Sequence, residues 1–159
     1  MKNFYLYEDR VEIVRENGQK LSIYFDSNTG SIHFRYKINT ISGVRHPRIC
    51  LGYDMNGNYY YMHNHEDHRR PVIETAVDFA KSQQLFLNER QSSYNRLTIV
   101  ERGLNEIQRS QSYQKLGYNC QVFVNRICFN ENRSEAVENW SGGIAVSLLL
   151  LFGIKALKF

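Results

Sequence analysis

Proline, cysteine and blocks of like charge are scarce in this chain of 159 residues. With only two prolines and ten glycines beside 42% hydrophobic residues, the composition excludes a collagenous or largely disordered chain. Three cysteines cannot pair into an even disulfide framework, and a chain of this length can bury a sizeable core without one. We therefore expect reduced thiols and a single globular domain.

Positive and negative charges are interspersed along the chain. Lysine and arginine number 20 and aspartate and glutamate 16, which leaves a formal net charge of +4. Because no block concentrates this charge, we expect no nucleic-acid partner, while a mild attraction to anionic membrane surfaces stays open. Glu8 and Asp9 precede any apolar run of signal-peptide length, so we expect no signal peptide and a catalytic domain in the cytosol.

The first part of the chain alternates apolar and polar residues with the period of β-strands. Asn17-Gly18, the segment 28–30 and Asn56-Gly57 supply turns between these strands. We expect successive antiparallel hairpins, with strands over 11–14, 21–25, 31–38, 49–53 and 59–65.

Apolar residues at helical spacing predict three helices, over 71–88, 98–109 and 120–129. Pro71 suits the first turn of the first helix, and Asn119 is a good N-cap for the third. Because strands come first and helices later, the chain is expected to be an α+β domain, an antiparallel sheet packed on helices.

This order divides the chain into three parts. Residues 1–130 are expected to form one catalytic domain, in which 1–40 supply additional N-terminal hairpins. The polar segment 131–141 is expected to be a linker, and 142–159 a C-terminal apolar helix.

That apolar segment carries no charge from 142 to 154. Thirteen residues at about 1.5 Å each make roughly 20 Å of helix, short of the roughly 30 Å hydrocarbon thickness unless Lys155 snorkels. Four consecutive leucines at 148–151 make the helix apolar all round, where a one-sided core helix would carry a polar stripe. We therefore expect a membrane anchor, with a buried core helix as the alternative.

Cys120 follows the expected N-cap Asn119 and so lies in the first turn of a helix. Unpaired backbone N–H groups and the positive end of the helix dipole stabilise an anion there, which predicts a lowered thiol pKa and donors for an oxyanion. The alternative is a small buried hydrophobic residue. Cys50 and Cys128, inside apolar stretches, are assigned to that alternative.

A nucleophilic cysteine needs a base, usually a histidine oriented by a third group. His46 begins an apolar strand, where its side chain can face a neighbouring helix terminus. His63 and His65 lie two apart on the next strand and share a face of the sheet, so one of them can orient His46; we favour His63. His33 and His68 are assigned no role.

The histidines and carboxylates of 63–68 also suggest a metal site, since imidazole and carboxylate suit zinc and related ions. We set this interpretation aside because no matching histidine or cysteine pair follows at a familiar spacing. No metal and no other cofactor are expected.

The histidine and cysteine segments together resemble a known family. Residues 46–52, HPRICLG, resemble the H-box of the lecithin retinol acyltransferase-like and HRAS-like suppressor proteins, and 60–63, YYMH, resemble that family's second histidine strand. Residues 119–125, NCQVFVN, are similar to its NC box, N-C-E-H-F-V-N. The resemblance covers about 44–159, and residues 1 to about 40 have no counterpart.

The resemblance implies a circularly permuted papain-like fold of the NlpC type. It makes Cys120 the nucleophile, His46 its base and His63 the polar third member, acting on phospholipid acyl chains through a thioester. Two departures matter: Gln121 and Val122 replace the glutamate and histidine of the NC box, and the hairpin between the two histidines is longer, so His65 could be the third member.

The function expected from these features is a membrane-associated thiol acyltransferase or phospholipase with acyl-lipid substrates. A papain-like cysteine peptidase or amidase, as in a bacterial effector or viral factor, is the first alternative. The second is a catalytically inactive, membrane-tethered interaction domain, which the altered NC box would mark.

Overall fold

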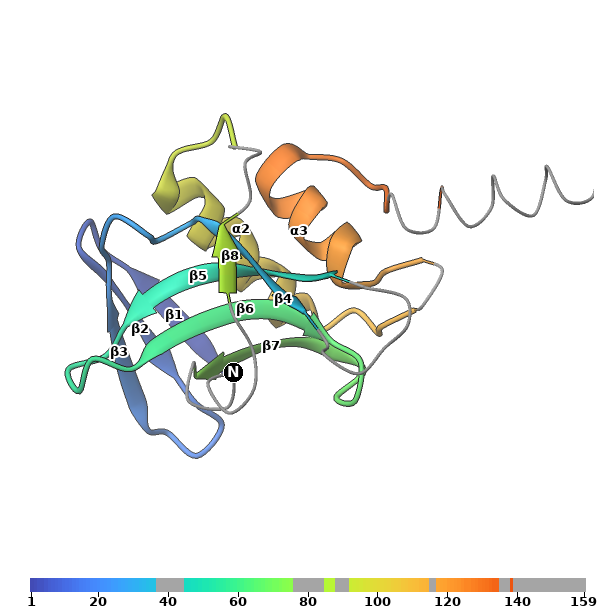
Figure 1. Cartoon of the computed structure of the whole chain (residues 1–159). Coiled ribbons are helices and arrows are strands. Elements are labelled where there is room, and N and C mark those ends of the chain that lie inside the picture. Colours follow the sequence, from blue (N-terminus) through green and yellow to red (C-terminus); the bar gives the residue numbers. More distant parts are fainter. Residues whose placement is uncertain (37–44, 76–84, 88–91, 115–116, 135–137, 139–159) are drawn as a thin grey trace, which may run out of the picture.

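The computed structural model describes residues 1–36, 45–75, 85–87, 92–114, 117–134 and 138. These residues form an α+β structure in which two helices pack on an antiparallel sheet of eight strands, as expected (Figure 1). The strands are β1 (Asn3–Leu6), β2 (Arg10–Val14), β3 (Lys20–Tyr24), β4 (Ile32–Tyr36), β5 (Arg45–Tyr53), β6 (Tyr59–His65), β7 (Arg70–Thr75) and β8 (Leu85–Leu87). The helices are α2 (Arg96–Arg109) and α3 (Cys120–Phe129).

Most predicted elements are confirmed. The strands at 11–14, 21–25, 49–53 and 59–65 and the helices at 98–109 and 120–129 correspond to β2, β3, β5, β6, α2 and α3. The strand at 31–38 corresponds to β4, and its last two residues lie outside the described residues. The sequence analysis missed β1, which pairs with β2 through all four of its residues.

The chain does not run as a simple series of hairpins. β1, β2 and β3 pair in sequence, as do β5, β6 and β7. After β3, however, the chain continues along the same edge of β5, the edge opposite β6. In the described residues β3 meets β5 only at Tyr24 and Tyr53, and β4 pairs with the other end of β5 and, on its own second edge, with β8. The turn before β4 keeps the chain on this edge: the Asp26 carboxylate accepts the backbone N–H groups of Asn28 and Thr29, and the N–H of Gly30 donates to the carbonyl of Cys50.

The predicted helix at 71–88 is wrong. Its described residues are strands, β7 and β8, while 76–84 and 88 lie outside the described residues. β7 pairs only with β6 in the described sheet, and such an edge tolerates Pro71, which lacks a donor N–H. The β-branched residues Val72, Ile73 and Thr75 fit a pleated strand, so pairing with β6 outweighs the helical spacing.

Alternation along β5 and β6 gives the sheet two different faces. Ile49 and Leu51 of β5 and Met62 of β6 are fully buried and belong to the main core. The helices cover this face with Val100, Leu104, Phe123, Val124 and Ile127. Cys50 and Tyr61 belong to a separate small cluster, so the residues between the core positions point to the opposite face. His63, which follows Met62, lies on that opposite face.

The expected C-terminal helix at 142–159 lies outside the described residues, as does most of the expected linker. Residues 131–134 are described and have no regular secondary structure. Neither α2 nor α3, the helices in the described part of the chain, has the length and apolar character needed to cross a bilayer.

Gly52 provides a test of the sheet geometry. The β5–β6 register shifts between Cys50 and Gly52, Gly52 has φ +132°, and a Cβ there would overlap the carbonyl oxygen of Tyr24 in β3. We expect Gly52→Ala to lower the free energy of unfolding by about 3 kcal/mol or more, because strained backbone and a clash with β3 add. The measurement is urea denaturation of both forms.

The matched control is Gly57→Ala in the β5–β6 turn. Gly57 also has positive φ, at +78°, but a Cβ there would meet nothing within 4 Å. It should cost only about 1–2 kcal/mol, the usual penalty for a side chain in left-handed backbone. Equal losses for the two variants would contradict the close approach of β3 to β5.

Candidate active site

Cys120 begins α3, and Asn119 caps this helix as predicted. The Asn119 side-chain oxygen accepts the backbone N–H groups of Gln121 at 3.0 Å and Val122 at 3.1 Å, so two of the orphan donors of the first turn are satisfied. Asn119 and Cys120 are both buried, each 6% exposed. The cap therefore fixes the helix start and with it the position of the sulfur.

The structure brings His46 to this sulfur. α3 packs across β5 and β6, and the N-terminal part of β5 carries His46 to the beginning of the helix. Cys120 Sγ lies 3.6 Å from His46 Nδ1, within hydrogen-bonding distance for sulfur. Residues 74 positions apart in the sequence thus form the thiol–imidazole pair that the sequence analysis proposed.

The predicted lowering of the Cys120 pKa is wrong. Burial raises this pKa to about 11, and the nearby N–H groups of Gln121 and Cys120 and the charge of Arg48 only partly offset it. The helix terminus acts in the expected direction, but removing the sulfur from water is the larger effect. At neutral pH the group is therefore a thiol, with His46 Nδ1 within reach of its proton, and not a preformed thiolate.

His63, the favoured third member, is tied to a carboxylate that the sequence analysis did not consider. It is buried on β6, and its Nε2 lies 2.9 Å from Oε2 of Glu74 on β7. Burial lowers the pKa of His63 to about 4, so a neutral imidazole donates this hydrogen bond. His65, the alternative third member, lies with its Nε2 3.3 Å from Glu74 Oε1.

His46, His63 and His65 meet at one cavity of about 140 Å³. Its lining is polar throughout and comprises His46, Arg48, His63, Asn64, His65, Glu66 and Asp67. Both candidates for the third member thus face the same small space as the base, from the strand next to it. Cys120 reaches this group through its contact with His46.

Sequence reasoning missed Glu74 and Arg48. Arg48 is 3% exposed, and its Nη1 lies 3.6 Å from Glu74 Oε2. Burial raises the pKa of Glu74, but the hydrogen bond from His63 and the neighbouring positive charges outweigh it and lower that pKa to about 2. The available signal was the position of Arg48, directly before the predicted apolar strand 49–53. An arginine buried with that strand requires a partner of opposite charge. Glu74 went unnoticed because its segment was predicted to be helical.

A buried amide fixes the segment before Cys120 to the sheet. Asn64 Nδ2 donates to the carbonyl oxygen of Tyr118 at 2.8 Å, and both residues are buried. Asn64 lies on the helix-facing side of β6, between His63 and His65. It therefore links the strand that carries these histidines to the segment that carries Cys120.

Cys50 and Cys128 are buried as expected, and His33 makes contacts within the sheet. Cys50 and Cys128 are fully buried, and burial raises the pKa of Cys50 to about 12. His33 Nε2 lies 2.8 Å from Ser31 Oγ and the ring contacts Tyr61. These residues are satisfied within the fold.

Comparisons with known proteins add no relative. The chain matches no protein-family model, no curated protein and no solved structure. The resemblance to the lecithin retinol acyltransferase-like family therefore stays a prediction that depends on the short motifs around His46, His63 and Cys120.

The two helix caps test how firmly Asn119 holds the start of α3. We expect Asn119→Ala to lower the free energy of unfolding by about 2 kcal/mol, because the N–H groups of Gln121 and Val122 lose their acceptor. Asn95→Ala, at the exposed cap of α2, should cost only about 0.5–1 kcal/mol, because Asn95 accepts only from Thr98. Chemical denaturation measures the free energy of unfolding of both variants. Asn119→Ser should recover most of the loss, because serine can also cap a helix. A larger loss in Asn95→Ala than in Asn119→Ala would contradict the two hydrogen bonds described for Asn119.

The raised pKa of Cys120 predicts how its reactivity depends on pH. Because the thiolate is the reacting form, alkylation by iodoacetamide should be slow at pH 7 and rise about tenfold per pH unit toward pH 10. Cys120 should still react before Cys50 and Cys128, which are fully buried. Peptide mapping of the labelled protein follows each site. A rate that is already maximal below pH 7 would instead indicate a thiolate–imidazolium pair.

Proposed function

We propose that the protein is a cysteine-dependent acyl hydrolase or acyltransferase in which Cys120 is the nucleophile and His46 the base. The observation that supports this most directly is the 3.6 Å contact between Cys120 Sγ and His46 Nδ1 at a capped helix start. Nucleophile and base within hydrogen-bond reach are the common element of thiol acyl catalysis. A purely structural cysteine would not require an imidazole at this distance.

The first half of the reaction forms a thioester. His46 Nδ1 takes the thiol proton as the sulfur attacks an ester or amide carbonyl, which suits a thiol that is protonated at rest. Asn119 accepts the N–H groups of Gln121 and Val122, so we assign the N–H of Cys120 as the backbone donor to the developing oxyanion. The tetrahedral intermediate then expels the alcohol or amine, which takes the proton back from His46.

The second half releases the acyl group. His46 removes a proton from water, an amine or a hydroxyl, which attacks the thioester carbonyl. The C–S bond breaks, the sulfur is protonated by His46, and the enzyme returns to its resting state. His63 or His65 would orient His46 from the shared cavity, and Glu74 in turn holds both of them.

The fold proposed for this chemistry is the circularly permuted papain-like arrangement. Its support is the order of the parts: the histidine strands β5 and β6 precede the cysteine helix α3, and that helix packs on them. The resemblance of the H-box and NC-box segments implies the same order.

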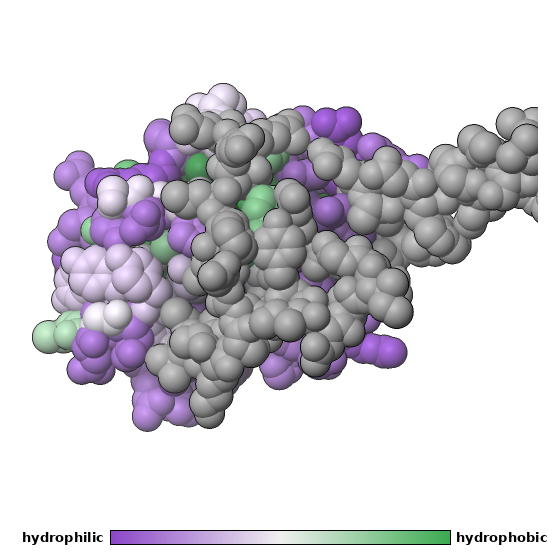
Figure 2. All heavy atoms as spheres, viewed as in Figure 1, coloured by the Kyte–Doolittle hydropathy of each residue, from purple (hydrophilic) through white to green (hydrophobic). Residues whose placement is uncertain are grey.

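We propose acyl lipids as the substrates and a membrane surface as the place of reaction, with the catalytic domain on the cytosolic side. This proposal depends on the apolar segment 142–159 and on the family resemblance. On the face seen in Figure 2 the described residues are mainly hydrophilic, with small separate hydrophobic areas. We assign the attachment to lipid to the C-terminal segment because it carries no charge from 142 to 154.

A second candidate is a cysteine peptidase or amidase. It is favoured by the cavity beside His46, which is small and lined by histidines, Arg48, Asn64 and carboxylates. Such a lining suits peptide groups or charged ends better than an acyl chain. The chemistry at Cys120 and His46 would be the same.

Activity assays separate these functions. Phospholipid vesicles and a peptide pool are incubated with wild type, Cys120→Ala and, as a matched control, Cys128→Ala. We expect lipid hydrolysis that falls at least about 1,000-fold in Cys120→Ala and persists in Cys128→Ala, because Cys128 is a core residue far from the chemistry. Cleavage of peptides alone would support the second candidate, and no cleavage of either would contradict the enzymatic proposal.

The same assay tests the anchor. A chain that ends at residue 141 should no longer sediment with vesicles but should still hydrolyse a soluble ester. Sedimentation of the truncated chain would contradict the role given to 142–159.

A further inference from the structure

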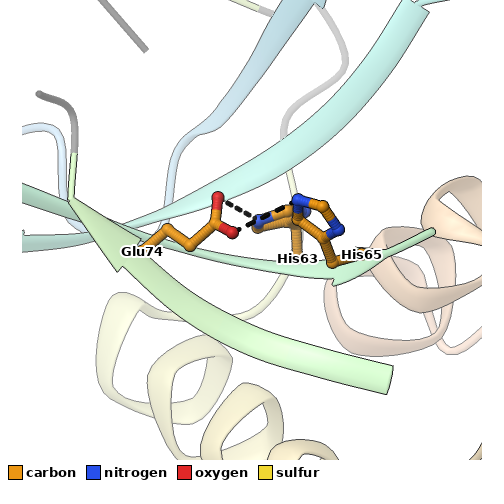
Figure 3. A group of neighbouring side chains, drawn as sticks. All are labelled: His63, His65 and Glu74. Carbon is orange, nitrogen blue, oxygen red and sulfur yellow. Dashed lines mark hydrogen bonds and ion pairs between the residues drawn. The ribbon is translucent and has the colours of Figure 1, made fainter. Parts of the chain in front are cut away.

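His63, His65 and Glu74 form a cluster of ligand-type side chains on the face of the sheet away from the helices. Figure 3 shows the two imidazoles of β6 and the carboxylate of β7 pointing toward one another. One donor atom from each residue lies within 4.8 Å of the other two. His63 Nε2 is 2.9 Å from Glu74 Oε2, and His65 Nε2 is 3.3 Å from Glu74 Oε1.

The strand register explains why these three residues converge. His63 and His65 are two apart on β6 and so share a face. In the antiparallel ladder β7 places Val72 opposite His63 and Glu74 opposite Tyr61, so Glu74 lies diagonally across from His63 on the same face. The sequence analysis set a metal site aside because the histidine cluster lacked a partner; β7 supplies it.

The spacing of the donor atoms suits a tetrahedral ion. With bonds of about 2.0–2.1 Å, two ligand atoms of a tetrahedral zinc site lie roughly 3.3 Å apart. The two imidazole–carboxylate distances are already close to this value, so small side-chain movements would admit an ion where hydrogen bonds now join the groups. Two imidazoles and one carboxylate are also the ligand types that zinc prefers.

A third imidazole lies beside the cluster. His68 follows in the turn between β6 and β7, with its Nε2 3.8 Å from Glu74 Oε1 and its ring 4.6 Å from that of His65. Its side chain is 58% exposed and so can move. It can therefore close the coordination shell from the solvent side.

The surroundings provide an entrance and an outer shell. The cavity lined by His63 and His65 is also lined by the carboxylates of Glu66 and Asp67, which attract cations. The buried guanidinium of Arg48 lies 3.6 Å from Oε2 of Glu74 and so restrains this oxygen. The other oxygen, Oε1, faces His65 and His68. Outer partners of this kind orient ligating carboxylates.

We propose that His63, His65 and Glu74 bind a divalent transition-metal ion of the zinc type, with His68 as the fourth ligand. The ion joins β6, β7 and the turn between them, and so stabilises the edge of the sheet. This site adjoins the proposed thiol site and shares His63 and His65 with it, but the binding of an ion does not require Cys120 to be a nucleophile.

Binding is tested on the full chain with Zn²⁺ and with Co²⁺ as a spectroscopic probe. We expect about one Zn²⁺ per chain by equilibrium dialysis and a thermal midpoint that rises with Zn²⁺ concentration. Bound Co²⁺ should show the visible absorption of tetrahedral nitrogen and oxygen ligation, without a sulfur-to-cobalt charge-transfer band. Failure to bind either ion would overturn the proposal.

Four variants locate the ion. His65→Gln and His68→Gln change partly exposed side chains and should fold; each should weaken Zn²⁺ binding at least about tenfold and reduce the thermal shift. His33→Gln, a histidine of the same sheet outside the cluster, is the matched control and should bind as wild type. Cys120→Ser should also bind as wild type, because the alternative site for an ion is the Cys120–His46 pair.

The outcomes discriminate clearly between these sites. Loss of binding in Cys120→Ser, or a sulfur-to-cobalt band in wild type, would place the ion at the thiol and refute the site on β6 and β7. Unchanged binding in His65→Gln would refute it as well. Weakened binding in His65→Gln with intact binding in His33→Gln and Cys120→Ser supports it.

Discussion

The antiparallel pairing of β5, β6 and β7 is the constraint on which the rest of this structure depends. Alternate side chains of β5 and β6 point to opposite faces of the sheet. The same strands therefore supply the apolar face on which the helices pack and polar side chains on the opposite face. Ile49 and Met62 anchor α3 and α2 on one face, while His63 and Glu74 meet on the other. The His63–His65–Glu74 cluster and the Cys120–His46 pair therefore both depend on the pairing of these strands.

Buried charges on both sides of the sheet limit how this region can change. On the polar face Arg48 and Glu74 offset each other's charge, and the neutral His63 donates a hydrogen bond to Glu74. Between the helices, the buried carboxylate of Glu106 accepts the Tyr118 hydroxyl at 2.8 Å and Arg126 Nη1 at 3.2 Å. Because Tyr118 precedes the cap Asn119, this second network also positions the start of α3. Removing one partner from either group would leave an uncompensated charge, which costs more than an exposed pair would contribute.

Burial also determines how the thiol can react. A helix terminus favours an anion, yet at 6% exposure the sulfur of Cys120 has lost too much hydration for that to dominate. In the reaction proposed for Cys120, the nearby imidazole is therefore more important than the helix dipole, because proton transfer during attack would avoid a stable buried thiolate. The same low solvation would strengthen any hydrogen bond to a developing oxyanion.

The sequence by itself determined the elements whose signals are local. Sequence alone predicted the bounds of α3, the cap at Asn119 and the strand β6. These features were predictable because the periodicity of apolar side chains and the chemistry of helix capping act over a few residues. The proximity of Cys120 and His46 was also anticipated, from the type and placement of the residues. Only the tertiary structure decided that 70–75 is a strand, since pairing with β6 overrides helical spacing, and that Glu74 therefore reaches His63 and His65. It alone set the sign of the Cys120 pKa shift, because burial arises from packing between distant segments and has no signature in a single stretch of sequence.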